Sequence, residues 1–240
     1  MLVLAGAPFP RGAHAEETLF ALCQPRTARG EAAGLQIETY APSSHWQRGD
    51  VLPLPGAHLI EPVQLLLGQR LGIAIVQGKL GDARDRSDLW NEAVLVGTRP
   101  LRRWPVPRET GWEPVQILCA PETGGDQQRL AILDRRKDGA GSRVRLIELS
   151  ISVNGPFWKP IAAWTVNGDV AAGAADWSRN RLFVLSESAR AGAAELTRID
   201  TVERSATKGD IAFAADASPR LNAQPAVLVI EPQGGAVWLL

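Results

Sequence analysis

The sequence EPVQLLL at residues 61–67 returns as EPVQILC at residues 113–119, a displacement of 52 residues. After each copy comes a turn and then a second apolar run, LGIAIV at residues 71–76 and LAIL at residues 130–133. Because self-similarity at a fixed period is the signature of repeat architectures, this stretch predicts a fold built from copies of one unit.

The second apolar run recurs along the whole chain, with steps of 52, 59, 52 and 55 residues between successive copies. The copies begin at Leu19, Leu71, Leu130, Leu182 and Val237. The longest step contains the insertion PETGGD at residues 121–126, which lengthens one turn at little cost in loop entropy. We therefore expect one domain over residues 16–240, with units at about 17–58, 59–110, 111–167 and 168–220 and a partial unit at 221–240.

Within each unit the apolar runs are short and bounded by Gly, Pro, Asn and Asp, which is typical of strands; no window keeps the 3.6-residue period of a helix. The third unit has four such runs, and we predict its strands at residues 113–119, 130–135, 144–151 and 160–166. The predicted fold class is therefore all-β.

Four antiparallel strands repeated around an axis describe the blades of a β-propeller, and the chain resembles β-propellers as an architectural class over roughly residues 17–240. The Gly-His and Trp-Asp pairs of WD40 repeats are absent. The resemblance implies four to five four-stranded antiparallel blades of about 52 residues each. Because the chain stops two strands into its last unit, a closed small ring and a partial propeller both stay open as interpretations.

The charge balance limits the classes of partner. Lys and Arg number 26, as do Asp and Glu, so the formal net charge is zero and no basic footprint for nucleic acid is present. No apolar run is long enough for a transmembrane segment. Arginine greatly outnumbers lysine, which we interpret as the coding bias of a GC-rich bacterial genome.

The N-terminus has some features of a secretory leader. Residues 1–7 are apolar, and the sequence AHA at residues 13–15 fits the small-x-small pattern of a signal-peptidase site, although a basic start is missing. We expect residues 1–15 to be a signal peptide of a periplasmic or extracellular protein. The alternative is a disordered tail on a cytoplasmic protein.

Two cysteines, Cys23 and Cys119, fall in different strands of non-adjacent units. Such positions rarely come within the short Cα separation that a disulfide requires. We expect both to be free thiols.

Candidate ligand-binding residues stand where inner strands begin. Glu61 and Glu113 occupy equivalent positions in the repeat, Asp169 precedes the inner strand of the fourth unit, and His58 leads into that of the second. Propeller geometry would bring them toward one mouth of a central channel, where carboxylates could bind Ca²⁺ or act as an acid–base pair. The structural alternative is that EPVQ recurs because the unit recurs, and that His58 only supports the fold.

No nucleophile elbow, phosphate loop or CxxC pair is present, so the sequence favours a binding scaffold that recognises a protein or small-molecule ligand through one face. The first alternative is a hydrolase or dehydrogenase of the propeller type, with acidic residues at the channel mouth. The second is a truncated fragment without activity of its own.

Overall fold

The computed structural model of the 240-residue chain consists of β-strands and one short 3-10 helix over the residues that it describes. No helix among these residues is long and apolar enough to cross a membrane. The described residues are 2–4, 19–23, 28–29, 35–41, 47–54, 64–68, 73–79, 89–95, 102–121, 127–139, 141–152, 154–187, 193–212, 228–230 and 237–239.

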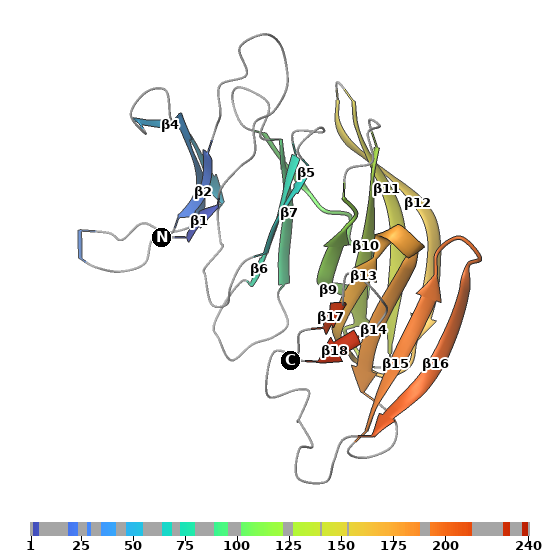
Figure 1. The fold of residues 1–240 in the computed structure, drawn as a ribbon. Helices are drawn as coiled ribbons and strands as arrows, with labels where there is room; N and C mark the ends of the chain where they lie inside the picture. The colour runs from blue at the N-terminus through green and yellow to red at the C-terminus, as the bar shows by residue number, and fades with distance from the viewer. Residues whose placement is uncertain are drawn as a thin grey trace. The chain divides into compact units, whose positions relative to one another are not determined.

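The chain divides into two compact units, and the first contains residues 1–107, 122–128 and 150–157. Two four-stranded antiparallel sheets belong to it, each with its strands in sequence order (Figure 1). The first sheet comprises β1 (Leu2–Leu4), β2 (Leu19–Cys23), β3 (Leu35–Ala41) and β4 (Gln47–Leu54). The second comprises β5 (Gln64–Gly68), β6 (Ile73–Lys79), β7 (Leu89–Leu95) and β8 (Arg102–Pro105).

The second unit contains residues 108–121, 129–149 and 158–240 and holds most of two further antiparallel sheets. One comprises β9 (Trp112–Cys119), β10 (Gln127–Arg136), β11 (Ser142–Ser152) and β12 (Gly155–Val166). The other comprises β13 (Val170–Asp176), β14 (Arg181–Glu187), β15 (Ala193–Asp200) and β16 (Ser205–Ala212), with the 3-10 helix η2 (Trp177–Arg179) between its first two strands. A short hairpin of β17 (Leu228–Ile230) and β18 (Val237–Leu239) follows.

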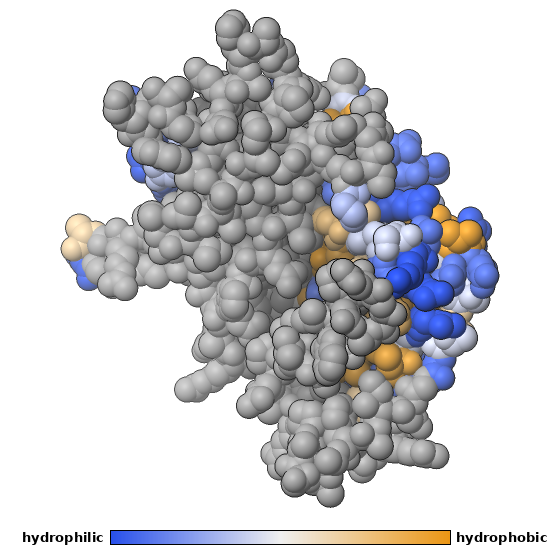
Figure 2. Space-filling view, viewed as in Figure 1, coloured by the Kyte–Doolittle hydropathy of each residue, from blue (hydrophilic) through white to orange (hydrophobic). Residues whose placement is uncertain are grey.

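The core of the second unit is an apolar cluster contributed by both of its four-stranded sheets. Its fully or almost fully buried members are Ala131, Leu133, Val144, Val166, Val170, Leu182, Val184 and Ile199. Side chains of a strand alternate between faces, so Ala131 and Leu133 share one face of β10 and leave Asp134 on the other. Figure 2 shows that hydrophilic residues dominate the visible surface of the described part, with smaller hydrophobic patches among them.

A β-bulge shapes the end of the β9–β10 ladder. Leu133 pairs with Gln116 but Asp134 pairs with Pro114, so Val115 is the extra residue of β9 in this register. Such an extra residue bends the strand and re-aims the side chains beyond it. Beyond the bulge, Arg135 pairs directly with Glu113.

The prediction of a β-propeller of four to five blades is wrong. The structure is all-β and its four-stranded antiparallel sheets keep sequence order, but the sheets are not closed into a ring in the part of the chain that is described. The strands expected at 113–119, 130–135, 144–151 and 160–166 correspond to β9, β10, β11 and β12. Hydrophobic alternation therefore predicted the strands of this unit, whereas ring closure depends on contacts between distant units that a repeat period does not specify.

Candidate functional site

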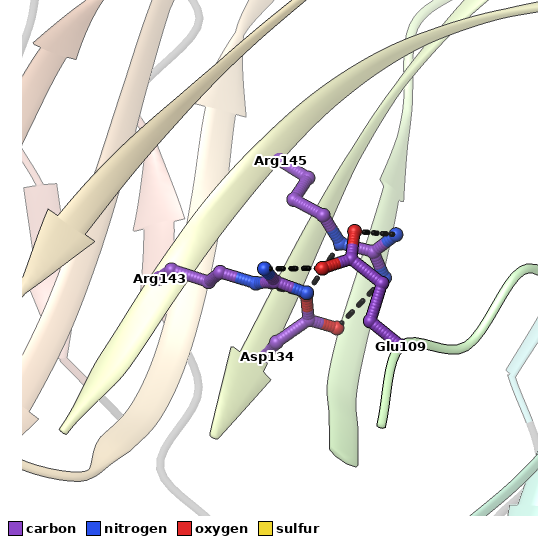
Figure 3. A network of polar contacts seen from close by, with 4 residues as sticks. All are labelled: Glu109, Asp134, Arg143 and Arg145. Carbon is purple, nitrogen blue, oxygen red and sulfur yellow. Dashed lines mark hydrogen bonds and ion pairs between the residues drawn. The ribbon is translucent and has the colours of Figure 1, made fainter. Parts of the chain in front are cut away.

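Four charged side chains meet on one face of the sheet formed by β9–β12 (Figure 3). Arg143 and Arg145 are two residues apart on β11 and therefore project from the same face. Asp134 faces them from β10, and Glu109 reaches them from the segment that leads into β9. We call these four residues the charged cluster.

Asp134 is the inner member of the charged cluster, with none of its side chain exposed. Its carboxylate accepts one hydrogen bond from Nε of Arg143 at 2.9 Å and two from Arg145, at 2.5 Å from Nε and 3.0 Å from Nη2. A buried carboxylate is tolerated only when it is paired and hydrogen-bonded. Asp134 therefore holds both guanidinium groups in place.

Glu109 is the outer member, and 53% of its side chain is exposed. It accepts a hydrogen bond from Nη1 of Arg143 at 2.6 Å, and its other oxygen lies 3.7 Å from Nη1 of Arg145. Ion pairs with an exposed partner contribute about 1 kcal/mol or less, because water competes for the charge. The two carboxylates thus differ: Asp134 is a buried partner of the arginines, and Glu109 is a solvent-exposed one.

Trp112 covers the guanidinium of Arg143, whose Cζ lies 4.1 Å from the ring centroid. Cζ of Arg136 lies 5.9 Å from the same ring. A guanidinium over an indole gains about 0.5–2 kcal/mol from the negative face of the ring. Trp112, Asp134 and Glu109 therefore fix the orientation of Arg143, yet its third nitrogen, Nη2, is buried and has no acceptor.

A groove of about 290 Å³ lies beside the arginines. Arg143, Arg145 and Ile147 line it from β11, and the apolar run PIAA at residues 160–163 lines it from β12. Ligand sites are concave and mostly apolar, with a few fixed polar groups. The groove fits that description, with an apolar wall and the arginines and Glu109 at its charged end.

The structure describes two of the four residues that the sequence singled out for ligand binding. Glu113 is 5% exposed, and its carboxylate accepts a hydrogen bond from Nη2 of Arg135 at 3.1 Å. Asp169 precedes β13, where its carbonyl accepts a hydrogen bond from the amide of Glu187 at 3.0 Å and its buried Oδ1 has no partner. Glu61 and His58 lie outside the described residues.

A role for these four residues in binding a ligand or Ca²⁺ stays a prediction. No group of three or more metal-ligating side chains occurs among the residues that the structure describes. Another residue of the repeated motif, Gln116, joins two sheets: its amide accepts from the Gly173 amide at 2.7 Å and donates to the Gly173 carbonyl at 3.2 Å. Glu113 and Gln116 thus both make contacts within the fold.

The charged cluster was not among the sites predicted from the sequence. A signal for it exists, because Arg143 and Arg145 alternate with apolar residues in the strand RVRLIEL, and Asp134 directly follows the buried run LAIL. Charged residues on the inward face of a strand are buried only when a partner neutralises them. The spacing alone does not identify that partner, since Asp134 and Glu109 come from two other segments.

No protein-family model matches this chain, and no curated protein matches it. Among solved structures, one described as the complex structure of the fission yeast SREBP-SCAP binding domains is similar, with 10% sequence identity and a TM-score of 0.50 over 93% of this chain and 52% of that one. The chain thus spans about half the length of that protein, and at this identity the likeness concerns the fold alone. A functionally unknown protein from Desulfotomaculum acetoxidans is 11% identical, with a TM-score of 0.28 over 94% of this chain and 72% of that one.

Proposed function

We propose that this protein is a binding protein that recognises a partner protein through an extended segment seated in the groove that residues of β11 and β12 line. The observation that carries the proposal is the open groove of about 290 Å³ with an apolar wall and a charged end. Residues of two neighbouring antiparallel strands line it, so an extended segment laid along these strands would pass over the groove. An extended peptide presents alternate side chains to such a surface.

The chemistry of β12 favours recognition by side chains over addition of a new strand. β12 is an edge strand and contains Pro156 and Pro160, which have no amide hydrogen to donate to an incoming strand. Prolines on an edge strand are a known way to block edge-to-edge pairing. The apolar wall and the arginines beside it are left as the recognition elements.

One solved structure with a similar fold is of binding domains. This similarity supports the proposal only as an analogy, because proteins of one fold differ widely in function. The alternative of an enzyme finds less support in the described residues. Its acid–base pair would use Glu113, whose carboxylate is engaged by Arg135.

Export to the periplasm or the cell exterior is also part of the proposal and rests on residues 1–15. Leu2–Leu4 forms β1 and pairs with β2, so cleavage after residue 15 would remove one strand of the first sheet. Cell fractionation with N-terminal sequencing of the mature chain tests this: a mature terminus at residue 16 in the periplasm or medium supports export, and an intact cytosolic chain excludes it.

Selection from a displayed library of random peptides against the folded chain tests the binding function. We expect enriched peptides whose affinity falls about tenfold or more in Ile161→Asp, because the change puts a charge in the apolar wall. Thr165→Asp is the matched control, since Thr165 is exposed on the same strand and does not line the groove. Thermal unfolding must show that both variants fold. The proposal fails when no peptide is enriched, or when enriched peptides bind Ile161→Asp as well as the wild type.

A further inference from the structure

We propose that the groove selects segments carrying an acidic side chain, which binds Arg143 in the place that Glu109 occupies in the free protein. This inference rests on the binding function proposed above and adds the chemistry of the partner. Its basis is the unequal hydrogen bonding within the charged cluster.

The first observation is the unused nitrogen of Arg143. Nε donates to Asp134, Nη1 donates to Glu109, and Nη2 is buried without an acceptor. A buried donor left unpaired destabilises the protein, and an acceptor oxygen of a ligand would remove that cost. Carboxylates suit this position, because their two oxygens match the two terminal nitrogens of a guanidinium.

The second observation is the difference between the two carboxylates. Asp134 is fully buried and accepts from both arginines, whereas 53% of the Glu109 side chain is exposed and Glu109 lies outside any strand. An external carboxylate can therefore replace Glu109 without disturbing the inner pair. In the free protein Glu109 occupies the ligand's place, where it accepts from Nη1 but not from Nη2 of Arg143.

The third observation is that Arg143 is oriented before any ligand arrives. Trp112 lies over its guanidinium at 4.1 Å and Asp134 fixes its inner edge at 2.9 Å. A side chain that is already ordered loses little entropy on binding, which favours affinity. The apolar run at residues 160–163 then contacts the residues next to the acidic one.

The test uses synthetic versions of the most enriched peptides, each paired with a twin in which the acid is replaced by its amide. We expect the amide twin to bind about tenfold more weakly, because it brings no charge to the arginines. Glu109→Gln should bind the acidic peptide about tenfold more tightly, because the competing carboxylate is gone, and should leave the amide twin unchanged. Arg143→Lys should weaken the binding of the acidic peptide, since an ammonium group cannot form the bidentate contact that a guanidinium makes with a carboxylate.

Glu148→Gln is the matched control for Glu109→Gln. Glu148 on β11 pairs with Lys159 on β12 at 3.1 Å and does not line the groove. Each of the two variants replaces a glutamate with glutamine, so both change the net charge equally. An equal gain in both variants would show a general charge effect and overturn the inference. Peptides that respond to Ile161→Asp but show no acid preference would also overturn it and leave the binding function standing. Failure to enrich any peptide would overturn both.

Discussion

Two nitrogens of Arg145 hold the carboxylate of Asp134, with Nε 2.5 Å from Oδ2 and Nη2 3.0 Å from Oδ1. The Asp134 side chain is fully buried and that of Arg145 is 9% exposed, so each charge depends on the other for the solvation that water no longer supplies. Arg143 shares the same carboxylate, which makes Asp134 the common partner of both arginines.

Removing Asp134 should therefore destabilise the fold strongly. In Asp134→Ala two largely buried guanidinium groups lose their inner partner, and we expect the free energy of unfolding to fall by about 3–5 kcal/mol. Urea unfolding followed by circular dichroism measures it. Asp138→Ala is the control, since Asp138 pairs with Arg136 at 2.6 Å on the surface, and there the loss should stay below about 1 kcal/mol. Equal losses in the two variants would contradict the assignment of Asp134 as a buried anchor.

Gly173 leaves no room for a side chain where β13 approaches the neighbouring sheet. A Cβ at this position would lie 2.5 Å from Cδ2 of Leu133, a fully buried core residue. Gly173→Ala should thus cost about 1–3 kcal/mol through overpacking. A double-mutant cycle with Leu133→Ala checks the cause, because removing Cδ2 should abolish most of the extra cost. If the losses of stability in Gly173→Ala and Leu133→Ala simply added in the double variant, a contact other than Leu133 would be responsible for the cost of Gly173→Ala.

Cys119 should resist alkylation in the folded protein. It is a free cysteine, and burial of its thiol raises the pKa to about 12 from an ordinary value of 9.0, although the residue as a whole is only partly buried. The thiolate is the reactive form, so iodoacetamide should modify Cys119 slowly at about pH 8 in the native protein and readily in urea. Peptide mapping by mass spectrometry distinguishes Cys119 from Cys23.

The same raised pKa gives stability a pH dependence on the alkaline side. The folded state favours the neutral thiol, so the contribution of Cys119 is present below pH 9.0 and declines as pH rises from there toward 12. Cys119→Ser should remove this part of the alkaline loss. If the free energy of unfolding fell equally steeply with pH in the wild type and in Cys119→Ser, the alkaline loss of stability would belong to other groups.

Asp176 should stabilise the fold in a pH-dependent way. Its carboxylate caps η2, and hydrogen bonds from the Ser178 hydroxyl and the Arg179 amide, together with the Arg179 charge, hold its pKa below the ordinary 3.8. Because the folded-state pKa is lowered, the contribution is present above pH 3.8 and is lost as pH falls through the folded value. Urea unfolding of wild type and Asp176→Ala should differ by about 1 kcal/mol at neutral pH and converge in acid. A difference independent of pH would show that the charge is not involved.

Pro160 should keep β12 from pairing with other chains. β12 is at the edge of its sheet, and a proline in a strand is tolerated where its nitrogen faces away from the ladder. Pro160→Val gives the edge strand a backbone amide hydrogen that can donate to another chain and adds a β-branched residue, so we expect concentration-dependent self-association in light scattering. Thr165→Val adds the same side chain without a new donor and should remain unassociated; association of both variants would point to hydrophobicity alone.

Local patterns in the sequence were enough to predict the strands of the third repeat unit. Short alternating runs bounded by turn residues predicted β9–β12, because side-chain alternation and turn chemistry are local properties that neighbouring residues carry. The recurrence of the EPVQ motif left a structural role for Glu113 open beside the predicted ligand-binding role. Glu113 and Gln116 each make a contact within the fold, and the ligand-binding role stays a prediction.

The meeting of the charged groups depends on tertiary contacts that no single stretch of the sequence specifies. Arg143 comes within 2.6 Å of Glu109, which lies 34 residues earlier in the chain, and within 2.9 Å of Asp134 on another strand. Strand register and the bulge at Val115 set which side chains share a face, and neither is encoded in the spacing of one strand. The prediction of a closed ring was wrong for the same reason: packing between distant segments depends on the shapes of both surfaces, which local spacing does not specify.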